Sequence, residues 1–217
     1  MEYVVFENVN KKIGHAEILN SVNITVREGE AVALCGRNAS GKTMMLRAIA
    51  GLIRPTSGKI TVAGKPLTLM NPYPESMGLI IETIKFWPYY TGFDCLKIIA
   101  SIKNEIKDED IRKAIRRVGL DPEDRRLLRK YSMGMRQRLA IAQAIMERPR
   151  LLLLDEPTNS LDDEGRDLFQ EIMHEEKSRG ATIVVATHIV EDLGSFCDTY
   201  YKVDNGMLRP INRSQLN

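Results

Sequence analysis

Cysteine and long apolar runs are scarce in this 217-residue chain. Its three cysteines, Cys35, Cys95 and Cys197, are far apart and lack the spacing of metal ligands, which favours a reducing compartment over a disulfide framework. No stretch approaches the roughly 20 apolar residues that cross a bilayer, and no basic segment followed by an apolar one opens the chain. The sequence predicts neither a membrane span nor a secretory route.

A strong charge imbalance is also lacking. The formal net charge is +2, a value that argues neither for nor against a nucleic-acid partner. Hydrophobic residues make up 43% of the chain and charged residues 28%, which is typical of a globular protein with a sizeable core. Since no repeat or low-complexity segment is visible, we expect one domain whose partners must be argued from individual sites.

One loop has the pattern of a triphosphate-binding site. It follows the apolar run 31–34, precedes a helical pattern at 44–50, and consists of Gly36, Arg37, Asn38, Ala39, Ser40, Gly41, Lys42 and Thr43. Glycines let successive backbone N–H groups face one concavity, where the next helix directs the positive end of its dipole. We expect Lys42 to reach the β- and γ-phosphates and Thr43 to bind Mg²⁺. The alternative, a plain glycine-rich turn, is disfavoured by the flanking strand and helix.

The sequence predicts strands of two kinds. Residues 3–9 and 22–26 alternate with period two, whereas 151–154 and 182–186 are continuous apolar runs of the kind buried on both faces in a parallel sheet. Between them, from Phe86 onward, apolar residues recur at helical spacing. The pattern predicts an α/β fold with an inserted helical lobe. The expected helices span residues 93–102, 108–118 and 133–147.

Two carboxylates follow the apolar strand 151–154. Asp155 stands where it can hold Mg²⁺ beside the phosphate loop, and Glu156 is then free to act as a general base toward the attacking water. A strand that merely ends in acidic residues is common in isolation. In a chain that already has the phosphate loop, the catalytic interpretation is favoured.

Two further segments fit the same chemistry. Ser132 and Gly134 stand at the start of the predicted helix 133–147, where an anion can bind, although a capped helix is the simpler alternative. His188 follows the strand 182–187 and should emerge at the carboxyl edge of the sheet, where ligands bind. A histidine there is as often a satisfied loop residue as a functional one.

Taken in this order, the segments resemble the ATP-binding subunit of ABC transporters over essentially the whole chain. The resemblance implies a P-loop NTPase with a mostly parallel central sheet, an N-terminal antiparallel β subdomain and an inserted α-helical lobe. It implies a core of residues 1–82 and 149–217 and a helical subdomain of residues 83–148. Gly36 to Thr43 resembles the Walker A loop, and Leu151 to Glu156 resembles Walker B with its catalytic glutamate.

The remaining motifs also receive roles from the resemblance. Ser132 to Met135 resembles the signature motif, Asn159 to Asp162 the D-loop, and His188 the switch histidine that contacts the γ-phosphate. The implied cofactors are ATP and Mg²⁺. The implied assembly is a head-to-tail homodimer or heterodimer of ATPase subunits, in which one signature covers the ATP held by the other Walker A loop.

The resemblance also implies partners and a location. We expect polytopic membrane permease subunits as partners, no nucleic acid, and a cytoplasmic position on the inner face of the membrane. DNA-repair and translation-associated ABC ATPases usually have a coiled-coil insertion or two fused halves, and a GTPase needs an Asn-Lys-x-Asp segment; none of these is visible. Glu82 and the form of the signature resemble ATPases that export peptide antibiotics, including lantibiotics.

Three positions depart from the family pattern. In the signature, Met133 and Met135 replace a glycine and the glutamine, while Ser132 and Gly134 are kept. Where an aromatic residue usually stacks on adenine, this chain has Ile13, with Tyr3 or Phe6 as weak substitutes. The third departure is Glu82, which stands in place of the usual Q-loop glutamine. We expect it to contact the metal or its water shell in the closed state and to signal to the membrane subunit through residues 86–92.

Basic residues are concentrated late in the helical lobe. A solvated helical face is the simpler interpretation, and proximity to anionic lipid headgroups is the sharper one. Between residues 112 and 138 they outnumber acidic residues by ten to three, and they are Arg112, Lys113, Arg116, Arg117, Arg125, Arg126, Arg129, Lys130, Arg136 and Arg138.

Overall fold

The protein is described by a computed structural model that covers residues 1–82 and 85–212. Its strands are β1 (Glu2–Ile13), β2 (Ala16–Arg27), β3 (Ala31–Cys35), β4 (Ser57–Val62), β5 (Lys65–Pro66), β6 (Met77–Ile80), β7 (Leu151–Asp155), β8 (Thr182–Thr187), β9 (Thr199–Asp204) and β10 (Met207–Ile211). Its α-helices are α1 (Lys42–Ile49), α2 (Gly92–Ala100), α3 (Asp108–Arg117), α4 (Met133–Ile145) and α5 (Asp163–Ser178), with short 3₁₀ turns η1 (Leu128–Lys130) and η2 (Val190–Leu193).

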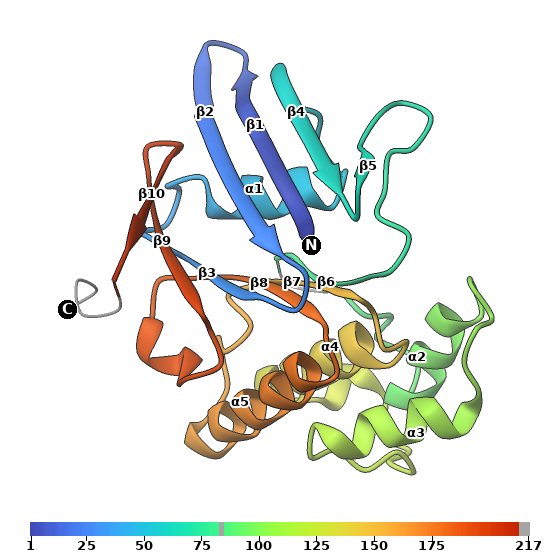
Figure 1. Cartoon of the computed structure of the whole chain (residues 1–217). Helices are drawn as coiled ribbons and strands as arrows, with labels where there is room; N and C mark the ends of the chain where they lie inside the picture. Colours follow the sequence, from blue (N-terminus) through green and yellow to red (C-terminus); the bar gives the residue numbers. More distant parts are fainter. Residues whose placement is uncertain (83–84, 213–217) are drawn as a thin grey trace.

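The elements form layers. Figure 1 shows a small sheet of β1, β2, β4 and β5 above the central sheet, with α1 between the two sheets and α4 and α5 on the opposite face of the central sheet. In the same view α2 and α3 lie at the far side from the hairpin of β9 and β10. The central sheet is therefore covered on both faces, which explains why its strands are continuous apolar runs.

The small sheet is antiparallel and has the order β2-β1-β4-β5. Val4 pairs with Val26 on β2 and with Val62 on β4, and all three side chains are buried. Both predicted strands are longer than expected, because irregularities in the register let β1 and β2 stay paired up to Ile13 and Ala16. The strand pairing thus continues past the segments in which buried and exposed residues alternate.

The central sheet has the order β10-β9-β3-β8-β7-β6 and is parallel except for β10. All residues of β3, β7 and β8 are buried. Since these three strands are adjacent and parallel, the segments that follow them meet at one edge of the sheet. This arrangement confirms the expected P-loop NTPase architecture and brings the phosphate loop next to Asp155 and His188.

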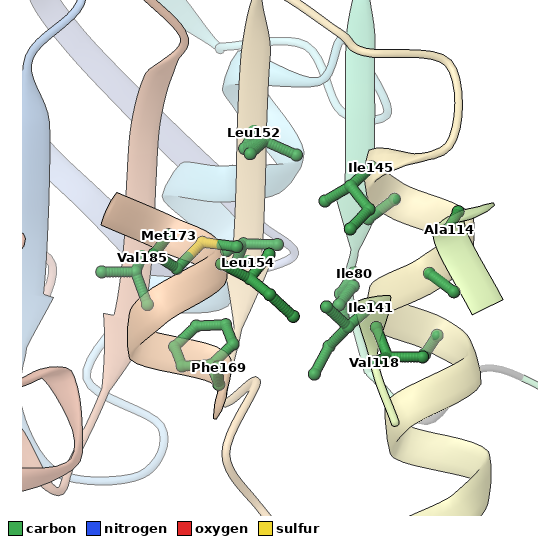
Figure 2. Close-up of a cluster of buried hydrophobic side chains, with 14 of the residues drawn as sticks. Ile80, Ala114, Val118, Ile141, Ile145, Leu152, Leu154, Phe169, Met173 and Val185 are labelled. Carbon is green, nitrogen blue, oxygen red and sulfur yellow. The ribbon is translucent and has the colours of Figure 1, made fainter. Parts of the chain in front are cut away.

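The helical lobe is joined to the sheet by apolar packing. Figure 2 shows Ile141 and Ile145 of α4 between Ile80 of β6 on one side and Ala114 of α3 and Val118 on the other. Burying aliphatic side chains of this size contributes about 1.5–3 kcal/mol each relative to exposure. The other drawn residues that carry labels lie on β7, β8 and α5, and they are Leu152, Leu154, Val185, Phe169 and Met173.

The expected start of the helical subdomain at residue 83 lies outside the described residues, as do residues 213–217 of the expected core. Within residues 1–82 and 85–212, no helix combines the length and the apolar character needed to span a membrane.

Candidate active site

The phosphate loop connects β3 to α1 in a tight turn. The Gly36 N–H donates to the Thr187 carbonyl over 3.3 Å, which ties the loop to β8. A Cβ at Gly36 would lie 2.3 Å from the Val203 carbonyl oxygen, so a larger residue does not fit there. Gly41 caps α1 with φ near +113°, a conformation that side chains disfavour. These two glycines make the tight turn between β3 and α1 sterically possible.

Lys42 points into this loop and is 5% exposed. Its Nζ donates to the carbonyl oxygens of Gly36 at 2.7 Å and Arg37 at 3.1 Å. It also lies 3.7 Å from Oε1 of Glu156, which is an ion pair rather than a hydrogen bond. The ammonium group is thus held where the phosphates of a nucleotide are expected.

Thr43 and Asp155 are joined directly. The Thr43 hydroxyl donates to Oδ2 of Asp155 over 2.7 Å, so α1 and the end of β7 meet at this point. Burial raises the pKa of Asp155; the hydrogen bond from Thr43 lowers it, and the charge of Glu156 raises it. Both side chains are oxygen ligands of the type that Mg²⁺ prefers.

Glu156 lies between Lys42 and His188. Its Oε2 is 2.8 Å from Nδ1 of His188 and also accepts from the Thr187 hydroxyl at 3.3 Å. The residue has φ near +46°, an uncommon conformation for a glutamate, at the sharp bend after β7. Strained backbone of this kind occurs often at functional sites. The expected carboxylate and histidine therefore do meet at the carboxyl edge of the sheet.

The site has polar atoms that form no hydrogen bond in the described part of the chain. Three buried oxygens form no hydrogen bond there: Oγ of Ser40, Oδ1 of Asp155 and Oε1 of Glu156. Leaving such atoms unsatisfied costs about 1–3 kcal/mol each. Ser40 lies on the phosphate loop, Asp155 ends β7, and Glu156 follows it directly. A metal ion with a nucleotide would supply the missing partners, so the residues present fit Mg²⁺ and ATP.

Glu82 lines the same region. It lies on a cavity of about 250 Å³ together with Asp155 and Glu156, and Met133 and Gln137 also line that cavity. Its negative charge raises the pKa of Asp155 as a minor contribution after burial.

The carboxylate of Glu82 is paired with the guanidinium of Arg47 on α1. Glu82 has φ near +61°, and its side chain is 64% exposed. Nothing in its sequence position indicated this partner, because Arg47 is separated from it by 35 residues.

The signature segment opens α4. Ser132 is the N-cap, and its hydroxyl accepts from the Met135 N–H over 3.1 Å. Gly134 packs on the D-loop, since a Cβ there would lie 2.9 Å from the Ser160 carbonyl oxygen. Ser132, Gly134 and Asp162 line a second cavity, of about 470 Å³. Met133, which replaces a glycine, is 70% exposed and does not disturb this packing.

Asp162 also has a structural role. It caps α5 by accepting from the Gly165 N–H over 3.0 Å, and it forms an ion pair with Arg138 of α4 at 3.0 Å. Both contacts lower the pKa of its carboxyl, that from Arg138 most. The D-loop is therefore fixed to the signature helix. A second link, which sequence reasoning missed, runs from Gln137 Nε2 to the Pro157 carbonyl at 2.7 Å.

The adenine side of the site is less complete. Ile13 is 52% exposed at the end of the β1–β2 hairpin, so it can offer apolar contact. The weak alternatives Tyr3 and Phe6 are wrong, because they are 4% and 2% exposed in the core of the small sheet. Both side chains belong to one cluster of buried hydrophobic residues.

Together, the glycine loop at the start of α1, the paired Thr43 and Asp155, and the Glu156–His188 contact define a P-loop nucleotide-binding site. Residues 19–159 match the family described as ABC transporter. The chain is 45% identical over 201 residues to the uncharacterized ABC transporter ATP-binding protein YybJ of Bacillus subtilis (strain 168), covering 93% of this chain and 92% of that one. The chain therefore belongs to the ABC transporter family, as an ATP-binding subunit and an ATPase.

Other relatives carry more specific names. The bacitracin transport ATP-binding protein BcrA of Enterococcus faecalis is 34% identical, with 100% of this chain and 71% of that protein covered. The lantibiotic transport ATP-binding protein SrtF of Streptococcus pyogenes is 33% identical, over 88% and 82%. A solved structure described as the ATP binding subunit of an ABC transporter superposes with a TM-score of 0.87 at 26% identity, over 98% of this chain and 91% of that chain.

Proposed function

We propose that the chain binds Mg·ATP at the loop of residues 36–43 and hydrolyses it to drive transport through separate membrane subunits. The observation that carries this proposal is the meeting of the segments after β3, β7 and β8 at one edge of the sheet, which brings Lys42, Asp155, Glu156 and His188 together. Backbone N–H groups of the loop and Lys42 bind the phosphates, and Ser40 supplies a further hydroxyl.

The other side chains of the site have separate roles. Thr43 and Asp155 hold the metal, which when bound neutralises charge on the phosphates. Glu156 accepts a proton from the attacking water as a general base, and His188 holds its carboxylate in position and reaches the γ-phosphate. Glu82 exchanges its contact with Arg47 for the metal or its water shell when the site closes.

The assembly that this proposal requires is a dimer of ATPase subunits. Ser132 and Gly134 lie at the start of α4, and as an anion site they would serve the ATP of a second subunit. A solved structure at 23% identity and a TM-score of 0.85 is described as dimeric, which supports the fold on which the dimer depends. The two subunits, identical or different, dock on polytopic permease subunits at the cytoplasmic face of the membrane.

The proposed cargo is a peptide antibiotic or another amphiphile that is moved outward. Relatives named for the transport of bacitracin and of a lantibiotic support this proposal, as does Glu82 at the Q-loop position.

To test it, the chain and its membrane subunits would be expressed in an antibiotic-sensitive host, and growth would be measured against bacitracin and a lantibiotic. We expect the wild-type complex to protect the host. The Lys42→Ala variant should lose this protection, and the exposed control Lys202→Ala should keep it. If the host is protected against neither compound although ATP hydrolysis is intact, the proposed cargo is wrong and the ATPase assignment stands.

A further inference from the structure

The loops that leave β7 and β8 are joined at a second point, beyond the contact between Glu156 and His188. The Thr158 hydroxyl donates to Oδ2 of Asp192 over 2.8 Å. Thr158 follows Glu156 in the loop after β7, and Asp192 follows His188 in the 3₁₀ turn η2. Each partner thus lies just downstream of one of the two residues that meet at the candidate active site.

Asp192 is held by three contacts. Its Oδ2 accepts from Thr158, its Oδ1 lies 3.6 Å from Nε of Arg166 on α5, and its backbone carbonyl accepts from Nε2 of Gln170 over 3.0 Å. Thr158 is 4% exposed, and the side chain of Asp192 is 14% exposed. A hydrogen bond to a carboxylate is stronger than one between neutral groups, and removing one partner here leaves the other unsatisfied. The link is therefore a fixed point of the structure, unlike an exposed surface pair.

The two contacts hold the two loops against each other. Because β7 and β8 are adjacent and parallel, both loops start at the same edge of the sheet. Oε2 of Glu156 lies 2.8 Å from Nδ1 of His188, and further along the same loops Thr158 meets Asp192. Two loops that are joined at one point can turn about that point, whereas a second point fixes their mutual orientation.

Glu156 needs such support. Its φ near +46° is uncommon for a residue with a side chain, and strained backbone persists only where the surrounding structure over-determines it. A general base must also stay within about 2.6–3.2 Å of the proton that it removes. A small displacement of this loop would therefore be costly for hydrolysis, even with every catalytic group present.

We infer that Asp192 is a positioning residue for ATP hydrolysis. By holding Thr158, it fixes the loop of Glu156 against the loop of His188 and so keeps the general base aligned with the attacking water. The inference rests on the roles proposed for Glu156 and His188. The groups that hold Asp192 lie outside the phosphate loop, so its loss should affect the chemical step and leave the binding of ATP intact.

Variants of Asp192 in the full chain separate positioning from a general loss of structure. In Asp192→Ala, kcat should fall roughly 10- to 100-fold, the scale for a slightly misplaced catalytic group, while KM and the equilibrium affinity for Mg·ATP stay nearly unchanged. Asp192→Asn keeps an oxygen that can accept from Thr158 and should recover most of kcat. The control Glu191→Ala removes the same charge from the exposed neighbouring position of η2 and should behave like wild type. Wild-type kcat in Asp192→Ala would overturn the inference, as would an equal loss in Asp192→Asn, which would assign the effect to the charge beside Arg166.

The partner of Asp192 gives an independent test that does not depend on the folding of Asp192→Ala. Thr158→Val has a similar shape without the hydroxyl and should lower kcat as Asp192→Ala does, whereas Thr158→Ser should keep it. If the link is the cause, the double variant Thr158→Val/Asp192→Ala should lose no more than either single variant. Additive losses would show that the two residues act separately, and the inference would be wrong.

A background of Glu156→Gln distinguishes this inference from the proposed function. Because Asp192 acts through Glu156, adding Asp192→Ala to Glu156→Gln should lower the residual hydrolysis no further in single-turnover assays. A further loss would overturn the inference. If Glu156→Gln alone hydrolyses ATP at a near-normal rate, the role proposed for Glu156 is wrong and the inference fails with it. If Glu156→Gln is inactive while Asp192→Ala matches wild type, the inference alone fails and the proposed function stands.

Discussion

The two halves of the proposed nucleotide site differ in how complete they are within one chain. At the sheet edge, Lys42, Asp155 and Glu156 are largely buried and already contact neighbouring groups of the site. At the start of α4, Ser132 and Gly134 line an open cavity of about 470 Å³. The first half is organised by strand order, whereas the second presents a helix N-terminus to solvent. The difference indicates that the second half needs a surface from another molecule.

The first half also explains why nucleotide should bind strongly there. Buried polar atoms on Ser40, Asp155 and Glu156 that form no hydrogen bond are costly, and a bound metal and phosphates would relieve that cost. No comparable cost exists at the exposed Ser132, whose hydroxyl already caps α4. Variants of the first half should therefore damage binding or chemistry outright, and variants of the second half should act only in the assembled dimer.

The largest expected effect is that of Glu156→Gln. An amide cannot accept a proton from water, so turnover should fall by about 10²–10⁴-fold while ATP binding remains. Steady-state ATPase assays and size-exclusion chromatography with ATP would measure both, and the mutant should accumulate an ATP-bound dimer that the wild type forms only weakly. Glu164→Gln, at an exposed position in the first turn of α5, is the control. Near-normal hydrolysis by Glu156→Gln would show that another group activates the water.

The second-largest expected effect is that of Lys42→Ala. Removing the ammonium group takes away charge-assisted hydrogen bonds worth about 1.5–3 kcal/mol, so affinity for Mg·ATP should weaken roughly 10- to 100-fold. Equilibrium binding of a fluorescent ATP analogue to the folded variant would measure it, with Lys202→Ala as the exposed control. Unaltered affinity would refute the assignment of the loop.

Much of the first half could be predicted from sequence, because each residue follows an apolar strand and parallel neighbours end at one edge. The loop, Asp155, Glu156 and His188 meet as expected. Sequence reasoning could not find Arg47 as the partner of Glu82, since that contact depends on how α1 packs beside the segment after β6. It also offered Tyr3 as an adenine contact, although that ring is 4% exposed in the core. Alternation alone does not reveal this, because Tyr3 and its neighbour Val4 are both buried.

Glu82 lies between the two halves and should have an intermediate effect. Glu82→Ala should depress transport by the full complex more than hydrolysis by the isolated chain, while Glu82→Gln should largely retain both, because the amide still offers an oxygen to the metal shell. Parallel assays of transport and ATPase activity would separate these outcomes. Wild-type transport by Glu82→Ala would make Glu82 an exposed partner of Arg47 and nothing more.

The smallest expected effect is a gain in stability from Asp155→Asn. Burial raises the pKa of Asp155, so the folded chain holds that proton more tightly than the unfolded chain, and stability falls as pH rises through the carboxyl's titration. Without nucleotide, Asp155→Asn should be more stable than wild type at pH 8, because the amide is uncharged and avoids the cost of burying a carboxylate. Thermal melts should show this advantage shrinking toward acidic pH. A less stable variant at pH 8 would contradict the account.

The comparison of the two halves is tested most directly by mixing two inactive variants. Lys42→Ala damages only the phosphate loop, and Gly134→Ala places a Cβ 2.9 Å from the Ser160 carbonyl oxygen and so damages only the signature. Met133→Ala, at the exposed neighbouring position, is the control and should stay active. If the site is shared between subunits, the mixture should regain about a quarter of wild-type ATP hydrolysis through dimers with one intact pair of halves. Hydrolysis by the mixture that is no higher than that of either variant alone would show that each chain acts by itself.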